Sequence, residues 1–313
     1  MNRFSVVVTT YNRCESLWDT LRALINQQLS DEIGLEIIVV DNNSKDQTRT
    51  IVEEIALNSP RPVRYLLETI QGKTHALNKG IHSASGNIIA FCDDDIVADL
   101  KWIQTLDEGF STFNADAAGG PVRPLWLAEP PEWFKIPSRQ FGMLAVFDRG
   151  NQAIVAGEAE RVAGNFLFGS NIAIHRSVFD EIGLFRTDLG PCGKRMAGGE
   201  DSEMVRRLLV AGKRVVYLPT AIVNHKIPAS RMTLTYLRKW NFWMARSNTR
   251  ISEFQNVTSG ILFLDCIKSA CAALFYYVKG LHVKAVGAEI NFWWRLGTLT
   301  EMLSRKKGYQ SCQ

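Results

Sequence analysis

The segment Asn87-Ile-Ile-Ala-Phe-Cys-Asp-Asp-Asp95 joins a short apolar run to three consecutive aspartates. A nearly continuous apolar run of this kind is typical of a parallel strand that helices cover on both faces. The surrounding chain repeats the pattern, because short β-branched runs alternate with amphipathic segments, as a βαβ sheet requires. We therefore predict an α/β fold with strands over Ser5–Thr10, Leu35–Val40, Val63–Leu67 and Asn87–Phe91.

The segments between these strands carry helix signals. Apolar residues recur at helical spacing over residues 17–25. Ser44 and Gln47 have the spacing of a capping box, which predicts a helix that starts directly after the turn following the second strand. Thr10–Arg13 and Asp41–Ser44 would then lie at the carboxyl ends of neighbouring strands. Open α/β sheets bind their ligands at that edge.

Composition excludes several classes of protein. The 313 residues are 46% hydrophobic and 22% charged, as in an ordinary globular protein and unlike a disordered or collagen-like chain. The six cysteines form no CxxC pair and no dense framework, so neither a zinc site nor a disulfide scaffold is indicated, and a reducing compartment fits best. The apolar run that follows the first residues is too short for a signal-peptide core. We expect a cytoplasmic main domain.

Charge is distributed unevenly along the chain. Residues 226–313 hold 13 Lys and Arg against 4 Asp and Glu, or +9, which leaves 23 against 28, or −5, for residues 1–225. We predict an α/β domain over 1–225 and a basic, aromatic-rich helical region over 226–313. Such asymmetry indicates an anionic membrane surface or phosphates as a partner, and nucleic acid is not predicted. A solvated basic face is the alternative.

Two stretches depart from the βαβ rhythm. Residues 124–165 interleave prolines with aromatic residues and predict a long irregular excursion, which in a compact domain is usually functional or a lid. From Thr233 onward the pattern is helical, and Gly260–Val278 is apolar apart from Asp265 and Lys268. With two charges inside it, this stretch is better interpreted as an interfacial or packed helix than as a membrane span.

The three aspartates after the fourth predicted strand are the sharpest chemical feature. Adjacent carboxylates repel one another unless a cation compensates them. In extended backbone Asp93 and Asp95 would share a face and reach one ion, with Asp94 pointing away. Hard oxygen ligands suit Mg²⁺ or Mn²⁺, which can also bridge phosphates. An acidic turn that caps a helix starting near Leu100 is the alternative.

Four ordered segments resemble the family 2 inverting glycosyltransferases: Ser5-Val-Val-Val-Thr-Thr-Tyr-Asn-Arg13, Val39-Val-Asp-Asn-Asn-Ser44, Gly86-Asn-Ile-Ile-Ala-Phe-Cys-Asp-Asp-Asp95 and Gly199-Glu-Asp201. The resemblance covers roughly residues 4–250, and four motifs in order are far more specific than one. It implies a GT-A fold, with a Rossmann-like nucleotide-binding sheet covered by helices on both faces, followed here by the C-terminal helical region.

The same resemblance implies a donor site. It makes the aspartate triplet the DxD motif, with Asp95 as direct metal ligand, Asp93 contacting ribose or metal and Asp94 beside the nucleotide. The other residues that would border the nucleotide are Thr9, Tyr11, Arg13, Asp41 and Lys73. An aromatic ring against the base and a carboxylate facing a ring N–H suit uracil or thymine. Packing of Tyr11 and simple solvation of Lys73 are the alternatives. The family's second aspartate after Asp41 is Asn42 here.

Glu200 and Asp201 are the candidate residues of the acceptor site. They precede an apolar helical pattern and so lie at a helix start. Displacement at an anomeric carbon with inversion needs a base for the acceptor proton, and a carboxylate is the usual choice. The resemblance makes Asp201 this base and Glu200 its acceptor-binding neighbour. Acids that complement a helix dipole are the alternative.

Three further positions match the family. His225 would be a third metal ligand, although a histidine that ends an apolar strand is often structural. Arg231 would neutralise the departing phosphates. Gly169-Ser-Asn171 matches a segment near the acceptor loop, and a turn before a helix explains it equally well.

We therefore expect a metal-dependent inverting transferase that moves a sugar from a nucleotide diphosphate-sugar, with UDP-hexose as donor, to the hydroxyl of a glycan or lipid-linked sugar in surface polysaccharide assembly. Mn²⁺ or Mg²⁺ would be its cofactor, and the protein would lie peripherally at the inner face of the cell membrane. The alternative is a non-catalytic nucleotide-sugar or glycan-binding module with the same fold. A sugar-nucleotide pyrophosphorylase is not supported, because the glycine- and arginine-rich N-terminal loop of such enzymes is missing. A dinucleotide oxidoreductase is not supported either, because no G-x-G-x-x-G follows the first strand.

Overall fold

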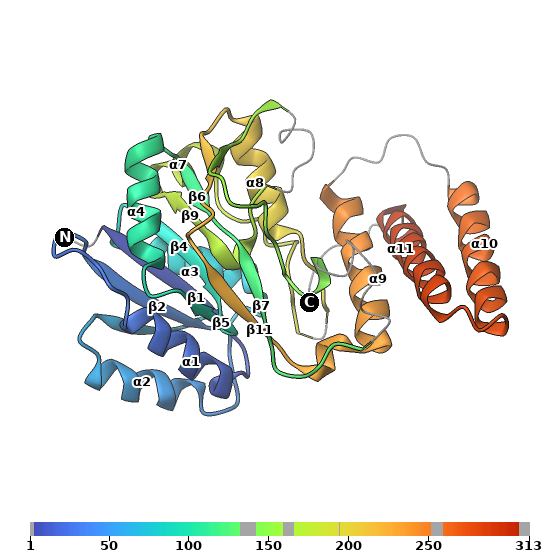
Figure 1. Cartoon of the computed structure of the whole chain (residues 1–313), viewed down its shortest axis with the longest axis horizontal. Coiled ribbons are helices and arrows are strands. Elements are labelled where there is room, and N and C mark those ends of the chain that lie inside the picture. The colour runs from blue at the N-terminus through green and yellow to red at the C-terminus, as the bar shows by residue number, and fades with distance from the viewer. Residues whose placement is uncertain (1–2, 132–141, 159–165, 194, 252–258, 307–313) are drawn as a thin grey trace. The chain divides into compact units, whose positions relative to one another are not determined.

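A computed structural model describes residues 3–131, 142–158, 166–193, 195–251 and 259–306 (Figure 1). The chain forms two compact units. The first comprises Met1–Leu125, Ala145–Thr187 and Glu200–Lys226, and the second comprises Trp126–Leu144, Asp188–Gly199 and Ile227–Gln313. The predicted boundary after residue 225 lies next to the last division between them, and two earlier stretches also belong to the second unit. Much of the predicted irregular excursion, 132–141 and 159–165, lies outside the described residues.

The first unit is built on an eight-stranded mixed sheet with the strand order β3-β2-β1-β4-β9-β6-β10-β8. Strands β1 to β4 are parallel, and β9 pairs antiparallel with both β4 and β6. The four predicted strands are confirmed within two residues at each end. The bounds are β1 Phe4–Thr10, β2 Leu35–Asp41, β3 Val63–Leu67, β4 Ile88–Asp93, β6 Ala117–Gly119, β8 Ile154–Val155, β9 Ile172–His175 and β10 Val215–Tyr217.

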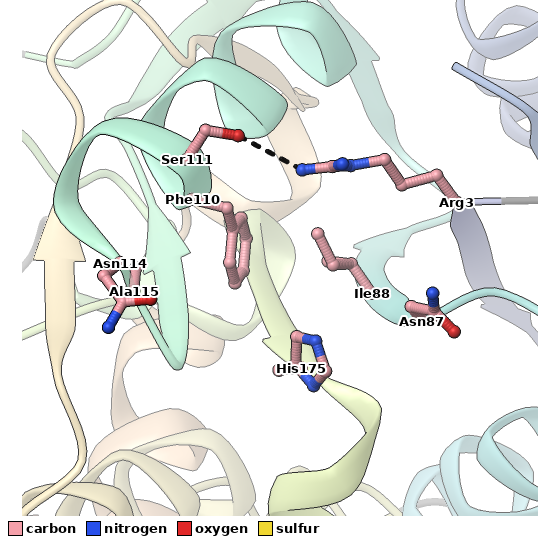
Figure 2. Close-up of a pocket in the computed structure, with 8 residues that line it drawn as sticks. All are labelled: Arg3, Asn87, Ile88, Phe110, Ser111, Asn114, Ala115 and His175. Atoms are coloured by element: carbon pink, nitrogen blue, oxygen red, sulfur yellow. Dashed lines mark hydrogen bonds between the residues drawn. The ribbon is translucent and has the colours of Figure 1, made fainter. Parts of the chain in front are cut away.

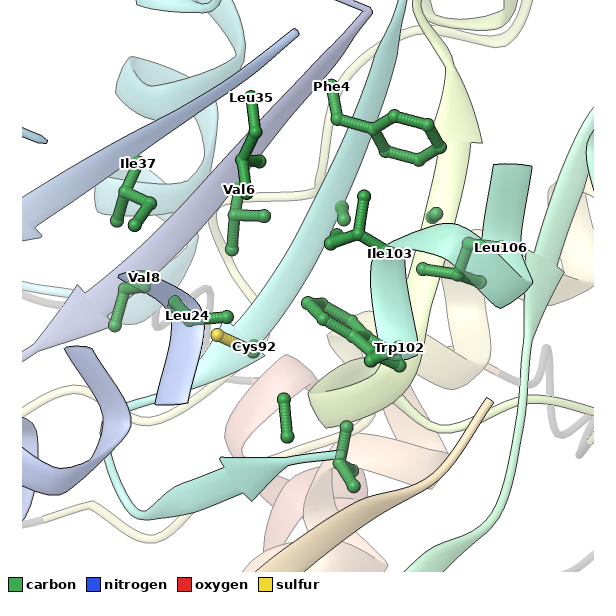
Figure 3. Packing of buried hydrophobic residues seen from close by; sticks show 14 of the residues in the cluster. Phe4, Val6, Val8, Leu24, Leu35, Ile37, Cys92, Trp102, Ile103 and Leu106 are labelled. Carbon is green, nitrogen blue, oxygen red and sulfur yellow. The ribbon is translucent and has the colours of Figure 1, made fainter. Parts of the chain in front are cut away.

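Helices cover both faces of this sheet, as predicted. Because alternate residues of a strand point to opposite faces, Val6 and Val8 of β1 pack with α1, α2 and α4, whereas Val7 packs with α3, α7 and α8. Figure 3 shows the first of these clusters, in which the fully buried Trp102 of α4 packs beside Leu24 of α1. The helices are α1 Cys14–Ile25, α2 Thr48–Asn58, α3 Lys73–Ser83, α4 Trp102–Phe113, α7 Arg176–Ile182 and α8 Glu200–Val210.

The predicted capping box at the start of α2 is wrong. The helix begins at Thr48, and its N-cap residue Gln47 makes no side-chain capping hydrogen bond. The Ser44 hydroxyl instead accepts a hydrogen bond of 2.8 Å from the backbone N–H of Asn12, and Asp46 accepts the N–H of Thr48 at 3.1 Å. The Ser44 hydroxyl therefore joins the loops that follow β1 and β2, and Asp46 satisfies the first N–H group of the helix.

A smaller three-stranded sheet has the order β5-β11-β7, with β5 Ile96–Ala98, β7 Val122–Trp126 and β11 Val223–Ile227. Strand β11 runs antiparallel to β5, with His225 opposite Ile96. The backbone N–H of Lys226 also donates to the carbonyl of Asp95 at 2.9 Å. This pairing carries the predicted histidine to the end of the aspartate triplet.

The second unit is helical after η3 Ala229–Met232, which confirms the prediction for the C-terminal region. Its helices are α9 Leu234–Ile251, α10 Ser259–Val278 and α11 His282–Lys306. Helix α11 packs against both α9 and α10. Glu301 of α11 is buried and accepts hydrogen bonds from Arg246 at 2.9 Å and Arg250 at 2.7 Å. Burial opposes ionisation of Glu301, but the bonds from these two arginines lower its pKa.

Candidate functional site

The sheet register gathers the ends of three strands at one edge. Thr9 of β1 lies opposite both Val40 of β2 and Asp93 of β4, and Thr10 lies opposite Asp41. The predicted neighbourhood of the loops after β1 and β2 is thus confirmed. Thr9 is buried, whereas Tyr11 in the next loop is 39% exposed, so its ring is open to a ligand. The site described next belongs wholly to the first unit.

Arg13 lies between two of the three aspartates. Its Nη1 atom is 2.6 Å from Oδ2 of Asp95 and 3.2 Å from Oδ1 of Asp94. Burial opposes the charge of this guanidinium, but the Asp94 and Asp95 carboxylates outweigh burial and raise the pKa of Arg13. Thr10 completes the arrangement by donating its hydroxyl to Oδ2 of Asp94 at 2.8 Å.

The expectation that Asp93 and Asp95 share a face while Asp94 points away is corrected by these contacts. Asp94 and Asp95 share Arg13, and Asp93 pairs with a different cation. The physical reason is that β4 ends at Asp93 and the chain turns at Asp94 and Asp95. The alternation of an extended strand therefore stops inside the triplet.

Lys73, at the first position of α3, connects the donor and acceptor motifs. Its Nζ atom is 2.6 Å from Oδ1 of Asp93 and 3.5 Å from Oε1 of Glu200. Burial would lower the pKa of this lysine, but the Asp93 and Glu200 carboxylates raise it. Local sequence pattern does not distinguish this role from solvation, because the two partners of Lys73 lie 20 and 127 residues further along the chain.

The carboxylates of this cluster outnumber its cations. The four carboxylates of Asp93, Asp94, Asp95 and Glu200 pair with two cationic side chains, those of Arg13 and Lys73. Burial, only partly opposed by neighbouring cations, raises the pKa of Asp94 to about 6 and that of Glu200 to about 7. Oε2 of Glu200 is buried and has no hydrogen-bond partner within the described chain. The cluster therefore has acceptor capacity and negative charge to spare.

A divalent cation fits this donor set. Hard carboxylate oxygens and one imidazole nitrogen are ligands that Mn²⁺ accepts. His225 is buried, and its Nε2 atom is 3.3 Å from Oδ1 of Asp95. Over the described ranges, no three His, Cys, Asp or Glu side chains are already arranged around a common metal position. The carboxylates contact Arg13 and Lys73 and are not arranged around a metal position. The roles of Asp95, Asp93 and His225 as metal ligands therefore stay predictions.

Asp201 is held by two backbone N–H groups. It lies in the first turn of α8, where Oδ2 accepts from Gly169 at 3.0 Å and Oδ1 accepts from Ser202 at 2.7 Å. A Cβ atom at Gly169 would come within 2.7 Å of the Asp201 Cβ, so a side chain there would displace the carboxylate. Glycine is required at position 169 because of its contact with Asp201, which lies 32 residues further along the chain. Sequence reasoning missed this requirement.

The other end of the Gly169-Ser-Asn171 segment is structural. Asn171 in the 3₁₀ helix η2 (Gly169–Asn171) is fully buried. Its side chain accepts from the Trp102 indole at 2.8 Å and donates to the carbonyls of Pro121 and Ala221 at 2.9 and 2.7 Å. The segment therefore both supports Asp201 and anchors its own loop in the core.

Asp41 and Asn42 have different tasks at the end of β2. Asp41 is buried and accepts from the Ser44 N–H and the Tyr65 hydroxyl, both at 2.8 Å. Burial and this bond raise the pKa of Tyr65 to about 12. A carboxylate has about four acceptor positions, so Asp41 can still accept from a base, which stays a prediction.

Asn42 holds the loop that leads to Lys73. Its amide donates to the carbonyl of Ile70 at 2.7 Å, and its oxygen accepts from the Gly72 N–H at 2.7 Å. An aspartate carboxylate in this position could accept the Gly72 N–H but could not donate to the Ile70 carbonyl, whereas an amide does both. The replacement of the family's second aspartate by Asn42 thus has a structural explanation. Arg231 lies in η3 of the second unit, and its role toward the diphosphate stays a prediction.

A pocket at the other end of the strands is distinct from this site. Figure 2 shows a pocket of about 290 Å³ lined by Arg3, Asn87 and Ile88 together with residues at the end of α4. Arg3 and Asn87 precede β1 and β4, whereas the aspartates follow β4. The pocket therefore lies at the amino ends of the strands, away from the carboxylates.

Comparison with known proteins decides the family. The model of glycosyl transferase family 2 matches residues 5–183, which is more than half of the chain and includes three of the four motifs. The chain belongs to glycosyl transferase family 2. The fourth motif, with Glu200 and Asp201, lies beyond the matched residues, so their assignment rests on the geometry above.

Relatives extend over both halves of this glycosyltransferase. It is 32% identical to the glucosyl-dolichyl phosphate glucuronosyltransferase of Haloferax volcanii over 249 residues, covering 78% of this chain and 76% of the relative. It is 28% identical to the succinoglycan biosynthesis protein ExoM of Rhizobium meliloti over 246 residues, with 78% and 73% covered. The homologues thus act in glycan and polysaccharide biosynthesis.

A solved structure supports the fold. The mannosyltransferase PcManGT of Pyrobaculum calidifontis, in complex with GDP-Man and Mn²⁺, matches with a TM-score of 0.59 at 20% identity, covering 99% of this chain and 76% of that one. The family 2 glycosyltransferase therefore has a GT-A-like fold with a mixed sheet and C-terminal helices.

Proposed function

We propose that this glycosyltransferase moves a hexose from a UDP-sugar to the hydroxyl of a lipid-linked sugar, with inversion at the anomeric carbon. The observation that carries the proposal is the pairing of two acidic groups through Lys73, which lies 2.6 Å from Asp93 on the donor side and 3.5 Å from Glu200 beside Asp201 on the acceptor side. One lysine thus contacts the two motifs that must act on the same anomeric carbon.

The donor would lie along the edge formed by β1, β2 and β4. Tyr11 offers an exposed ring to the base, and Asp41 keeps acceptor positions for a ring N–H such as that of uracil. Thr9 and the aspartate triplet lie between them and the acceptor motif. Arg13 and Lys73 place positive charge where the diphosphate leaves, which stabilises the charge that develops there.

The metal would occupy the acidic excess at this edge. Asp95, Asp93 and His225 would hold Mn²⁺ or Mg²⁺, which adds positive charge toward the diphosphate oxygens when bound. Binding of a cation would favour the ionised form of Asp94, whose pKa is raised by burial and, to a smaller extent, by the Asp95 carboxylate. The pyrobaculum mannosyltransferase, a structural relative, was solved with Mn²⁺.

Asp201 would act as the base. As the acceptor oxygen bonds to the anomeric carbon, Asp201 takes the hydroxyl proton and the bond from that carbon to the diphosphate oxygen breaks. The Gly169 and Ser202 N–H groups fix the orientation of the carboxylate, and each of its oxygens keeps a further acceptor position. Attack from the face opposite the leaving group inverts the configuration, and the nucleoside diphosphate carries away the electron pair.

One relative supports the proposed acceptor class. The name of the Haloferax volcanii protein specifies a glucosyl-dolichyl phosphate, a sugar on a polyprenyl phosphate, and this relative covers the acceptor half of the chain. We extend this acceptor class to the present protein and assign it to surface glycan assembly.

A donor and acceptor screen tests the proposal. UDP-glucose, UDP-galactose, UDP-glucuronate and GDP-mannose are first ranked by thermal shift with Mn²⁺, and the best donor is then incubated with polyprenyl phosphate-linked monosaccharides. We expect a UDP-sugar to be preferred and the product to have the anomeric configuration opposite to that of the donor, read by NMR. Donor hydrolysis without transfer to any sugar, or retained configuration, would contradict the proposal.

A further inference from the structure

Helix α10 has an unusual distribution of apolar side chains. Within the described part of the chain it is the one helix long and apolar enough to cross a membrane, with a mean hydropathy of 1.7 over its best 18-residue window. A core helix of a soluble protein can have the same composition, but only 22% of that window is buried here. The apolar surface of α10 is therefore not consumed by packing within the protein.

The buried stripe of α10 is narrow. Cys266, Ser269 and Ala273 recur at three- and four-residue spacing and are buried on the side that packs against α11. Figure 1 shows α11 between α9 and α10. The outward side carries large apolar side chains that are each about half exposed or more: Ile261, Phe263, Leu264, Ile267, Leu274, Phe275 and Val278. A continuous apolar face of this size marks an interaction site.

A cationic groove borders this face. It has a volume of about 490 Å³ between α10 and α11, and its lining includes Lys268, Lys284 and Arg295 against the single carboxylate of Asp265. Arg295 donates to the hydroxyl of Ser269, which fixes the guanidinium along the groove. Lys268 follows Leu264 by one helical turn, so the groove opens at the margin of the apolar face.

We propose that the outward face of α10 and this groove form a binding site for an anionic lipid bilayer. The apolar side chains enter the boundary between headgroups and acyl chains, and Lys268, Lys284 and Arg295 bind lipid phosphates. Phe275 lies at the end of α10 beside Lys279, whose Nζ atom is 6.0 Å from the ring centroid. Aromatic and basic residues at the margin of an apolar face are the composition of interfacial helices.

A bilayer explains the surface better than a protein partner does. A protein would have to supply an apolar surface and anionic groups in register with this one margin, whereas a bilayer presents both everywhere. Residues 259–306 carry 6 Lys and Arg against 3 Asp and Glu, so the net charge of +3 is attracted to anionic lipid.

The helix lies along the membrane surface and does not cross it. Helix α11 packs along α10 and carries charged residues from its first turn to its last, among them Lys284, Glu289 and Glu301. A crossing of the bilayer would take these charges into hydrocarbon, which is costly. The surface orientation leaves them at the headgroup side.

Flotation of the full chain with vesicles tests the site, and it does not depend on the proposed transfer reaction. We expect the wild type to float with phosphatidylcholine vesicles that contain phosphatidylglycerol, at least tenfold more than with pure phosphatidylcholine, and to be released by salt. Leu274→Glu should lower the bound fraction at least tenfold. The double variant Lys268→Glu, Lys284→Glu should remove the preference for anionic vesicles.

The matched control is Leu57→Glu in α2, which makes the same chemical change at a side chain that is 86% exposed in the first unit. It should float like the wild type. Thermal unfolding of each variant and binding of UDP with Mn²⁺ should be unchanged, which separates a loss of lipid binding from misfolding. Background flotation of the wild type, equal flotation of Leu274→Glu, or a lipid-free dimer that Leu274→Glu dissociates would overturn the proposal.

Discussion

The donor edge of the first unit buries charged side chains, whereas helix α10 of the second unit exposes apolar ones. At the donor edge Asp94, Asp95 and Glu200 are charged groups taken out of water, whereas Phe263 and Leu274 of α10 are apolar groups left in it. Both arrangements cost free energy in the isolated protein. The buried charge is compensated only in part by Arg13 and Lys73, and the exposed apolar surface has no partner within the described residues. The first therefore indicates a ligand that adds positive charge, and the second a partner that removes water.

The most severe test of this comparison removes one of the proposed metal ligands. Asp95→Asn should lower turnover at least about 10³-fold, because a bound metal supplies several kcal/mol of charge stabilisation. Folding should be nearly unaffected, since Arg13 keeps its contact with Asp94 at 3.2 Å. Steady-state transfer with a fixed donor, together with the unfolding temperature, measures both.

Metal removal is the companion experiment for Asp95→Asn. EDTA should abolish transfer by the wild type, and added Mn²⁺ should restore it. Full turnover in EDTA would show that Arg13 and Lys73 alone compensate the diphosphate, and the acidic excess would then have another purpose.

Removal of the proposed base should have the next largest effect. Asp201→Asn should lower kcat by roughly 10² to 10⁴-fold, the usual contribution of a positioned base, and leave UDP affinity near that of the wild type. Calorimetry with UDP and Mn²⁺ measures the affinity. Asp31→Asn, at an exposed position in a turn, is the matched control. Loss of UDP binding along with turnover would make Asp201 a donor-site or structural residue.

A smaller effect is expected from the glycine that supports this base. Gly169→Ala puts a methyl group within 2.7 Å of the Asp201 Cβ and should displace the carboxylate. A displacement of about 1 Å can cost about 10²-fold, so we expect a loss of about 10 to 100-fold in kcat with little change in the KM for the donor. Gly150→Ala provides a comparison, because its Cβ would meet no atom within 4 Å, although Gly150, unlike Gly169, has a positive φ that disfavours alanine. A change confined to KM would argue against positioning of the base.

The predictable part of this molecule is the part set by local pattern. Strand ends, the position of the triplet after β4 and the start of α8 at Glu200 follow from apolar periodicity within about ten residues. Contacts between loops do not. The Ser44 hydroxyl accepts a hydrogen bond from Asn12 and does not cap the helix that follows it. The turn after Asp93 places Asp94 and Asp95, and not Asp93, beside Arg13. These depend on groups 32 to 82 residues apart.

The same distinction applies to the second unit. The pattern predicts an apolar helix over residues 260–278, but periodicity cannot tell which partner covers it. Only the packing on α11 shows that one narrow stripe is used and the opposite side is exposed. Exposure is thus a tertiary property, as is the burial of charge at the donor edge.

The smallest effect expected concerns the stability of the acidic cluster itself. Burial raises the pKa of Glu200 from its ordinary value of 4.5 to about 7 in the folded protein. Below pH 4.5 both folded and unfolded chains are protonated at this group. Between pH 4.5 and 7 the unfolded chain releases the proton first, so Glu200 makes the fold progressively less stable as pH rises, and the loss is complete above pH 7.

Glu200→Gln removes this titration but keeps the shape of the side chain. The unfolding temperature of Glu200→Gln relative to the wild type should therefore rise between pH 4.5 and 7.5 and stay level above that. The rise should be about 10 °C in all, because the change in pKa corresponds to about 3 kcal/mol and each kcal/mol shifts the unfolding temperature of a domain of this size by about 2–4 °C. Metal-free protein is required, because a bound cation would stabilise the ionised form and remove the effect. Other groups that titrate in this range are common to both proteins, so the difference isolates Glu200. A difference that does not vary with pH would mean that Lys73, 3.5 Å away, already compensates the buried charge in full, and the donor edge would then hold no unbalanced acid for a metal to neutralise.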